Sequence, residues 1–586
     1  MLIVDDIAQM LDNTDIDKVL SDFGKLTGKD DPIVYFYELF LEVYNPDLRG
    51  KRGVYYTPIQ VVRYIVRSVD ALLRSEFALR DGLSDTAMIE YQLPPEKEQQ
   101  ESEKKTAPRV LVLYPACGTG TFLYAVVEHA RAEAKASGNA GRWCPFVQER
   151  LLPRLFGFEL LMAPYAIAHL KLELQLSGLD LPPSDRPTWS CQFQRDERIN
   201  VFLTNSLEPA VPKSTVLLGQ YITDEAESAA HVKRDMPIMV VLGNPPYKGQ
   251  SANRTFTEEV VLKGRRKVKV KTPTFIGRLM EDYYLCDGKR IPEQNPKWIQ
   301  NDYVKFLRFG QWRIEGSGSG VLAFITASSY LDSPTFNGVR QHLLDAFSDI
   351  YILDLHGSAR RREASGRTGR DQNVFEISEG VAIGLFVRRT GATGRGRVQY
   401  AEVWDELQPK LDWLDSHSID TTTWTDVQPV APLYLFVRAD AATDAIWQRG
   451  MSLPDAMPTH GAGVVTSRDG LVVDPDKGVL EKRIAAFLDP KLKDDDARLK
   501  FFGPSKPDDP YPAGDNRDWK LPQKRRLLRS DKKWRDHLEL VTYRPFDTEW
   551  MLYHQHAVDF PRNLSSPVRH PVVEITEAAS PLWSAG

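Results

Sequence analysis

The chain has 586 residues, of which 42% are hydrophobic and 26% charged, and its formal net charge is −5. This length predicts two or three domains with sizeable cores, and the composition is that of an ordinary soluble globular protein. No apolar run approaches the roughly 18 to 20 residues of a membrane-spanning helix, and the acidic start MLIVDDIAQMLDNTD is unlike a signal peptide. We therefore expect a cytoplasmic protein that does not associate with membranes.

The cysteines and the basic residues indicate the cellular environment and the type of ligand of the protein. Four cysteines are scattered without paired metal-ligand spacing, which favours a reducing cytoplasm and no metal site: Cys117, Cys144, Cys191 and Cys286. Three basic runs occur in this otherwise acidic chain, at residues 263–271, 360–370 and 524–533. One such run is typical of a solvated loop, whereas three together favour a face that meets phosphate groups.

In chain order, two helical patterns come first. The apolar segment 32–44 predicts a buried helix, and Thr57-Pro58 opens a second helix with valines and isoleucine on one face. Short apolar strands then alternate with helical stretches, which predicts a parallel, doubly wound α/β sheet. The expected strands are 109–114, 155–159, 201–204, 239–242, 321–326, 350–355 and 380–388.

Past about residue 400 this alternation fades, and proline, glycine, tryptophan and charged turns dominate. The sequence therefore predicts three parts. They are an N-terminal helical segment (1–50), a Rossmann-like α/β domain (51–400) and a mixed or mainly β C-terminal domain (401–586).

A glycine-rich turn and an acid follow the first two strands. Pro115 to Gly120 reads PACGTG and leads into a helix, so the backbone there can approach a ligand closely. Glu159 ends the next strand, where a carboxylate typically accepts from ribose hydroxyls. A plain turn and a surface acid remain the alternative interpretations, and the full dinucleotide and P-loop patterns are missing.

The most informative motif is Asn244-Pro245-Pro246-Tyr247, directly after the apolar run 239–242. An amide side chain and a carbonyl freed from the backbone ladder by proline can both accept hydrogen bonds from an NH2 group. The aromatic face of Tyr247 can stack on the planar ring that carries this group. The motif therefore predicts a site that holds a flat amine, such as adenine N6, in line with an electrophilic methyl group.

Taken in order, these segments resemble the amino-group DNA methyltransferases that depend on S-adenosyl-L-methionine. Longer phrases are similar to the methyltransferase and target-recognition portion of type ISP restriction-modification enzymes, over about Asp31 to Tyr553. They include RGVYYTPIQVVRYIVRSVD (52–70), MAPYAIAHLKL (162–172), FLTNSLE (202–208), NDYVKFLRFGQWRI (301–314), DQNVFEISEGVAIGLFVR (371–388) and TYRPFDTEW (542–550).

The resemblance implies a role for each matching residue. Tyr56, Thr57 and Pro58 would contact the methionine end of the cofactor, Glu159 its ribose, and Asn205 its adenine ring. The glycine turn would wrap the cofactor through Pro115, Ala116, Cys117, Gly118 and Gly120. Asn244 and the Pro245 carbonyl would accept the two N6 hydrogens of a flipped adenine, with Pro246 completing the motif.

The resemblance also implies two aromatic contacts to the flipped base. Tyr247 would stack on it, and Phe375 would close the base pocket from the other side. The alternative for Phe375 is a core aromatic preceding Ile377. The implied partner is double-stranded DNA. A separately encoded nuclease or translocase is left open, because the nuclease and ATPase parts of full-length type ISP enzymes are not found.

Two departures from the family pattern stand out. Tyr114 occupies a position that usually holds an acid, and the C-terminal segment after the YRPFD phrase resembles nothing in the relatives. These departures raise the hypothesis of a truncated recognition domain, and with it the alternative of a non-catalytic DNA-binding remnant. A protein-glutamine methyltransferase and cytosine-N4 modification are further alternatives, since an NPPY motif suits those amines too.

Overall fold

In the computed structural model of the chain, the described residues are 57–92, 104–138, 140–191, 198–209, 220–247, 251–263, 266–291, 293, 296–359, 371–438, 446, 449–451, 453–456, 464–505, 509, 511–516, 518–544 and 547–559. The chain divides into two compact units, residues 1–440 and 441–586. Residues 401–440, which we expected in the C-terminal domain, belong to the first unit. The helical segment expected over 1–50 lies outside the described residues.

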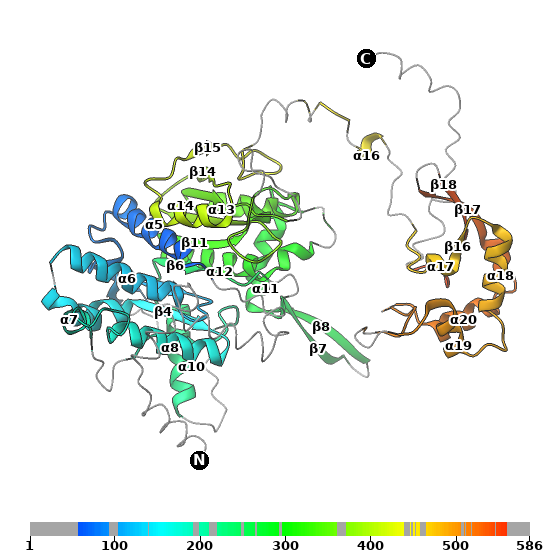
Figure 1. The fold of residues 1–586 in the computed structure, drawn as a ribbon, viewed down its shortest axis with the longest axis horizontal. Helices are drawn as coiled ribbons and strands as arrows, with labels where there is room; N and C mark the ends of the chain where they lie inside the picture. The colour runs from blue at the N-terminus through cyan, green and yellow to red at the C-terminus, as the bar shows by residue number, and fades with distance from the viewer. Residues whose placement is uncertain are drawn as a thin grey trace. The chain divides into compact units, whose positions relative to one another are not determined.

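A nine-stranded sheet forms the centre of the first unit (Figure 1). Its strand order is β15-β14-β12-β13-β11-β6-β3-β4-β5. The strands are β3 (Val112–Tyr114), β4 (Leu155–Glu159), β5 (Val201–Leu203), β6 (Val240–Gly243), β11 (Gly320–Ala327), β12 (Asp349–Asp354), β13 (Val381–Arg388), β14 (Arg397–Glu402) and β15 (Thr425–Val427). The predicted Rossmann-like, doubly wound α/β fold is confirmed.

The sheet is mixed at one end, where we expected parallel strands throughout. Strand β13 lies between β11 and β12 and runs antiparallel to both, and β15 runs antiparallel to β14. The described residues that connect β12 to β13 contain no helix. A parallel partner requires a long crossover, usually a helix, so a strand that returns without one pairs antiparallel.

Apolar side chains on both faces of the sheet explain the runs of consecutive apolar residues in its strands. Val240 and Leu242 pack into one core, whereas Val241 between them packs into the other. The first core is covered by α5 (Ile59–Phe77), α6 (Thr121–Ala136), α8 (Met162–Leu176) and α14 (Leu407–Ser416). The second is covered by α10 (Gln220–Arg234), α11 (Phe275–Met280), α12 (Asp302–Ser317) and α13 (Asn337–Ala346).

The chain changes direction across the sheet between β3 and β6. From β3 it proceeds through β4 to β5 on one side, and then returns to place β6 on the other side of β3. Strands β3, β4, β5 and β6 are mutually parallel, so their carboxyl ends share one edge. Ligands of open α/β sheets bind at such a switch point, and the glycine turn, Glu159 and the NPPY motif all follow strands that end there.

Smaller elements complete the first unit. Three hairpins are formed by β1 (Met88–Gln92) with β2 (Lys104–Pro108), β7 (Phe256–Lys263) with β8 (Arg266–Pro273), and β9 (Leu285–Cys286) with β10 (Lys289–Arg290). Two short helices, α7 (Trp143–Phe146) and α9 (Arg186–Trp189), lie near the sequence positions of two cysteines.

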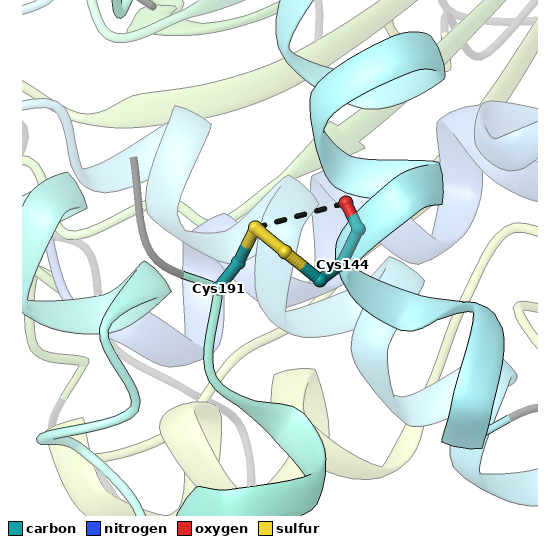
Figure 2. The surroundings of a disulfide bond; sticks show 2 residues. All are labelled: Cys144 and Cys191. Atoms are coloured by element: carbon teal, nitrogen blue, oxygen red, sulfur yellow. Dashed lines mark hydrogen bonds between the residues drawn. A yellow bond between two sulfur atoms is a disulfide. The ribbon is translucent and has the colours of Figure 1, made fainter. Parts of the chain in front are cut away.

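Cys144 and Cys191 form a disulfide, with their Cα atoms 4.9 Å apart (Figure 2). This pairing could not be predicted from the sequence, where the two cysteines are separated by 47 positions. The packing of α7 near the end of α9 brings them together. A disulfide is not expected in the reducing environment that we inferred from the scattered cysteines, because thiols stay reduced there. Cys117 and Cys286 are free and buried.

The second unit combines helices with a small antiparallel sheet of order β16-β18-β17. Its elements are α16 (Leu453–Ala456), α17 (Asp469–Val472), β16 (Val473–Asp474), α18 (Lys477–Phe487), α19 (Asp494–Phe502), α20 (Leu521–Ser530), β17 (Leu538–Arg544) and β18 (Asp547–Leu552). The elements from α17 to β18 enclose a core that includes Leu480, Trp519 and Leu552. In the part of the chain that the structure describes, no helix is long and apolar enough to cross a membrane.

Candidate active site at the switch point of the sheet

A cavity of about 430 Å³ opens at the carboxyl ends of β3, β4, β5 and β6. Most of the residues that the sequence singled out line it together, although they come from segments far apart in the chain. They are Thr57, Pro115, Ala116, Gly118, Glu159, Asn205, Asn244, Pro245, Pro246 and Tyr247. We call this cavity the pocket.

The other predicted residues lie beside or behind the pocket. Pro58 is the residue before α5, and Gly120 precedes α6 with a φ of 77°. Cys117 is buried, and burial raises the pKa of its thiol well above the usual value. Phe375 is buried against Tyr247. Tyr56 lies outside the described residues.

The Glu159 carboxylate is held by three backbone N–H groups. Oε1 accepts from Leu160 at 2.9 Å and from Leu161 at 2.8 Å, and Oε2 accepts from Gly118 in the glycine turn at 2.8 Å. These charge-assisted bonds fix the carboxylate against the turn and stabilise its ionised form. A carboxylate oxygen has room for more than one hydrogen bond, so Glu159 can still accept from ligand hydroxyls in the pocket.

Asn244 presents a buried acceptor that none of the described residues satisfies. Its Nδ2 donates to Thr57 Oγ1 at 2.9 Å, across 187 positions of sequence. Its Oδ1 is buried and has no hydrogen-bond partner in the part of the chain that the structure describes. An unpaired buried acceptor costs about 1–3 kcal/mol, and a ligand N–H that enters the pocket would recover this cost. Thr57, expected as a cofactor contact, therefore also orients the Asn244 amide.

Gly243 is required at the pivot between β6 and the NPPY motif. Its φ is 152°, which L side chains rarely adopt, and a Cβ there would lie 2.5 Å from the Tyr114 ring. Tyr114 is buried, and burial raises the pKa of its hydroxyl well above the usual value. The residue that replaces the usual family acid is thus a packing partner for the pivot and part of the pocket wall.

The Tyr247 ring is fixed at its tip and on two sides. Its hydroxyl donates to the Ile325 carbonyl at 3.1 Å. Tyr303 and Phe375 meet it nearly perpendicular, with ring centroids 6.4 Å and 6.1 Å away. The Phe375 ring is therefore not parallel to the Tyr247 ring.

Asn253 and Asp302 form a polar wall of the pocket that no sequence pattern indicated. Asn205 donates to Asn253 Oδ1 at 3.0 Å, and Asn253 donates to Asp302 Oδ1 at 3.1 Å. Asp302 begins α12, so it had the sequence pattern of an ordinary first-turn acid. Only the fold of the 251–256 loop reveals that it faces the pocket.

Two buried lysines anchor this wall from behind. Lys233 Nζ donates to the Asn205 carbonyl at 2.8 Å, and Lys305 Nζ donates to the Asn253 carbonyl at 2.6 Å. Burial lowers the pKa of each ammonium to about 8. Both side chains are occupied with backbone carbonyls, so they position the wall and do not face the cavity.

The three basic runs of the sequence differ in where they lie in the structure. Residues 263 and 266–271 lie in the β7–β8 hairpin, and 360–370 lie outside the described residues. In 524–533, Arg525 is buried and donates to the Phe487 carbonyl, and Arg529 donates to the Leu488 and Asp489 carbonyls. These two arginines stabilise the second unit, so they do not contribute to the phosphate-facing surface that the three runs together favoured.

Two groups of described residues come close to metal-ligand spacing, namely Asp70–His129–Glu133 and Asp531–His537–His554. Arg74 pairs with both carboxylates of the first group. In the second, His554 Nδ1 accepts from the His556 backbone N–H, so Nε2 carries the proton that Asp531 accepts at 3.1 Å. A metal-bound histidine binds the ion through one ring nitrogen and donates through the other. Both ring nitrogens of His554 are already hydrogen-bonded within the chain. Hydrogen bonds and ion pairs therefore account for both groups.

The fold and the pocket define the class: a Rossmann-like α/β protein with its ligand site at the switch point. Residues 455–573 match the family model of the Type ISP C-terminal specificity domain. This match confirms the predicted resemblance to type ISP restriction-modification enzymes, and it extends past Tyr553, where we expected the resemblance to end. No match was found among curated proteins.

Solved structures of similar fold cover most of the chain. The DrdV–DNA complex is 23% identical with a TM-score of 0.57, over 90% of this chain and 46% of that one. The Type ISP enzyme LlaBIII bound to DNA is 23% identical with a TM-score of 0.60, over 90% and 31%. A nuclease-deletion mutant of LlaGI with a DNA substrate mimic is 20% identical with a TM-score of 0.57, over 89% and 39%. The chain spans less than half the length of each, and at these identities the likeness shows the fold.

Proposed function

We propose that this chain is a site-specific DNA adenine-N6 methyltransferase of a restriction-modification system. S-adenosyl-L-methionine is its methyl donor, and double-stranded DNA is the methyl acceptor. The observation that carries the proposal is the Asn244 amide in the pocket wall, whose buried Oδ1 has no partner among the described residues while Thr57 fixes the amide. An acceptor held in this way fits the N6 amino group of adenine.

The residues present fit the proposed cofactor. Glu159 lies at the carboxyl end of β4, where its carboxylate can accept from the ribose hydroxyls. Gly118 and Ala116 let the backbone of the glycine turn approach the ligand. Asn205 lines the pocket just after β5, which pairs with β4, and it would lie near the adenine ring. When bound, the cofactor supplies an electrophilic methyl group on its sulfonium.

The NPPY residues then act on the target base. Asn244 Oδ1 and the Pro245 carbonyl accept the two N6 hydrogens, which favours a pyramidal nitrogen and aims its lone pair at the methyl group. Tyr247 stacks on the base, and Phe375 borders it. This arrangement accelerates transfer by positioning and by fixed dipoles, with no general base among the proposed residues.

A base within a duplex cannot reach a pocket of this kind, so it must be flipped out, at a cost of a few kcal/mol. Stacking on Tyr247 recovers roughly 1–3 kcal/mol of that cost. The second unit, with its match to a specificity domain, would supply sequence recognition. We propose that residues 51–400 carry the methyltransferase and that the C-terminal domain selects the site.

The cellular setting follows from the substrate. We propose that the chain acts on DNA in the cytoplasm. A nuclease or translocase would act as a separate partner.

The test is methyl transfer from radiolabelled S-adenosylmethionine to unmethylated plasmid DNA, followed by nucleoside analysis. We expect N6-methyladenine, and a loss of about 10²- to 10³-fold in Asn244→Ala, because the variant removes one oriented acceptor. Asn200→Ala is the matched control: Asn200 binds the Leu152 carbonyl just before β5, at the opposite edge of the sheet. Its activity should stay close to that of the wild type.

Other products would redirect the proposal. N4-methylcytosine would assign the same pocket to cytosine, and methyl groups on added protein would assign it to a glutamine amide. Tyr114 in place of the family acid favours one second candidate, a DNA-binding remnant without catalysis. Calorimetry with S-adenosylmethionine separates the two, because a folded chain that binds DNA but not the cofactor would be the remnant.

A further inference from the structure

The loop that precedes β13 carries Phe375 to the ring of Tyr247. The two centroids are 6.1 Å apart and the ring planes differ by 78°. Phe375 is 7% exposed and belongs to the core on the α5 side of the sheet. The orientation of Tyr247 therefore depends on where this loop places Phe375, and the loop is held by polar groups that have no part in the chemistry described above.

Asn373 fixes the backbone on both sides of Phe375. Its Nδ2 donates to the Glu379 carbonyl at 2.6 Å and to the Gly357 carbonyl at 3.2 Å. Its Oδ1 accepts from the Phe375 backbone N–H at 2.8 Å. One side chain thus satisfies the turn that bears Phe375 and connects that turn to its two neighbours.

The approach of Asn373 to Gly357 is very close. A Cβ at Gly357 would lie 2.4 Å from the Asn373 Cα, and the φ of Gly357 is 83°. No side chain fits between the two segments. The glycine therefore lets Asn373 reach both carbonyls.

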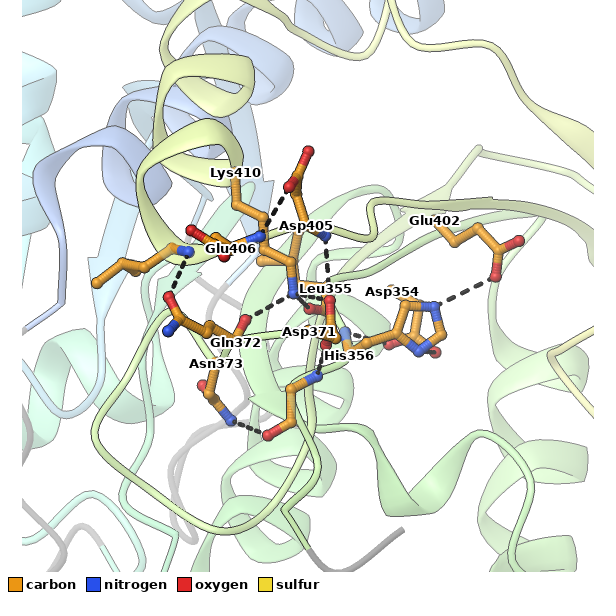
Figure 3. Close-up of polar contacts among 12 residues, drawn as sticks. Asp354, Leu355, His356, Asp371, Gln372, Asn373, Glu402, Asp405, Glu406 and Lys410 are labelled. Carbon is orange, nitrogen blue, oxygen red and sulfur yellow. Dashed lines mark hydrogen bonds and ion pairs between the residues drawn. The ribbon is translucent and has the colours of Figure 1, made fainter. Parts of the chain in front are cut away.

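A buried ion pair anchors the start of the same loop (Figure 3). Lys410 Nζ lies 2.7 Å from Asp371 Oδ1, and both side chains are 0% exposed. Lys410 also donates to the Leu355 carbonyl at 2.6 Å and to the Gln372 carbonyl at 2.7 Å. Asp371 Oδ2 accepts from the Gly357 N–H at 2.6 Å. We call Gly357, Asp371, Asn373 and Lys410 the Phe375 network.

Stability alone is a weak reason for such a network. Burying two charges costs several kcal/mol per ion, and an apolar pair of similar volume is often as stable. What the buried pair and the Asn373 bonds supply is a single loop geometry. That geometry ends at the aromatic ring that contacts Tyr247.

We propose that Asn373 is a positioning residue for the target base. With Asp371 and Lys410 behind it, Asn373 fixes Phe375, and Phe375 in turn holds the Tyr247 ring at the angle at which a flipped base stacks. The inference rests on the proposed function, because it assigns a base to Tyr247. It predicts that Asn373 acts on methyl transfer through Phe375 and leaves cofactor binding unchanged.

A double-mutant cycle on the full chain tests this route. Asn373→Ala should lower kcat for plasmid DNA by about 10- to 100-fold, with KM for S-adenosylmethionine changed less than about twofold. In the Phe375→Ala background, Asn373→Ala should have almost no further effect, because the group through which it acts is gone. Asn200→Ala is the matched control, and thermal unfolding of each variant shows that the fold is retained.

The proposal is overturned if the two substitutions multiply their effects on kcat, or if Asn373→Ala weakens cofactor binding as much as it lowers kcat. Either result would mean that Asn373 only supports the general fold. If the two effects are independent but the wild-type enzyme methylates DNA, the positioning role of Asn373 fails and the proposed function stands.

A second measurement does not depend on activity. Fluorine NMR of 4-fluorophenylalanine at position 375 should give one resonance in the wild type, and a shifted or broadened one in Asn373→Ala. An unchanged resonance would overturn the positioning role even if the enzyme is active. If the wild type transfers no methyl group, the proposed function fails, and the resonance still decides whether Asn373 fixes Phe375.

Discussion

The pocket and the Phe375 network treat buried polar groups in opposite ways. In the pocket wall, Asn244 Oδ1 is buried and has no partner among the residues that the structure describes. In the network, Lys410 Nζ contacts a carboxylate and two carbonyls, and both polar atoms of the Asn373 side chain are hydrogen-bonded. The two regions meet where Phe375 contacts Tyr247.

This difference distinguishes Asn244, which is suited to bind a ligand, from the Phe375 network, which fixes the position of a neighbouring residue. An unpaired acceptor in a buried site costs free energy until a ligand donates to it, so Asn244 is kept ready for a donor from outside the chain. A network whose members are mutually bonded gains nothing from a ligand and resists rearrangement. Rigid groups behind a contact residue preserve its geometry, which is what positioning of a base requires.

The largest effect is expected from breaking the buried ion pair. Asp371→Asn removes the charge that neutralises the Lys410 ammonium in a place without solvent. We expect a loss of about 3–5 kcal/mol in the free energy of unfolding of the first unit, because one partner of a buried ion pair is removed while the Lys410 charge stays buried. Urea unfolding followed by tryptophan fluorescence measures it.

Two variants sharpen this expectation. Asp371→Asn combined with Lys410→Met removes both charges and should recover part of the loss. Glu128→Gln breaks the half-exposed pair between Arg63 and Glu128, whose side chains are 36% and 38% exposed, and should cost about 1 kcal/mol or less. A loss in Asp371→Asn no greater than in Glu128→Gln would contradict the structural role of the buried pair.

Much of the pocket could be predicted from sequence because neighbouring parallel strands run in the same direction, so their carboxyl ends lie at one edge of the sheet. The expected strand 155–159 matches β4 residue for residue, so Glu159 was placed correctly at its end. The NPPY motif and the glycine turn follow β6 and β3 in the same way. Apolar runs between turns are strong local signals, and local signals are what sequence patterns carry.

What depended on long-range packing could not be predicted. The bond from Asn244 to Thr57 joins residues 187 positions apart, and Asn253 and Asp302 face the pocket only through the fold of a loop. The reversed strand β13 had the same apolar pattern as a parallel one. For Phe375 the sequence left two interpretations open, and the structure shows a buried core aromatic that also contacts Tyr247.

A smaller effect is expected where the two regions meet. Tyr247→Ala removes the stacking face, worth about 1–3 kcal/mol per base, so kcat/KM for DNA should fall by about 5- to 150-fold. Tyr247→Phe keeps the ring and loses only the hydrogen bond to the Ile325 carbonyl, worth about 1 kcal/mol. Equal losses in the two variants would show that the hydroxyl, and not the ring, supports the reaction.

The smallest effect concerns the pH dependence of the region around the network. His356 lies beside Glu402 at 3.2 Å and stacks on Trp404, and Asp354, Asp371 and Lys410 face it from neighbouring segments. Burial lowers the pKa of its imidazole to about 4, although the carboxylates act in the opposite direction. The folded protein therefore keeps His356 neutral where the unfolded chain protonates it.

Because the folded-state pKa lies below the ordinary value of 6.5, the contribution of neutral His356 to stability is complete above about pH 6.5. It is lost as the pH falls from about 6.5 towards 4, at up to about 1.4 kcal/mol per pH unit. His356→Asn suits the φ of 53° at this position and does not titrate. Urea unfolding at pH 7 and pH 5 should show that acid costs the wild type about 1–2 kcal/mol more than the variant. If acid destabilises both proteins equally, His356 does not stay neutral in the fold, and the acid sensitivity of this region comes from its carboxylates.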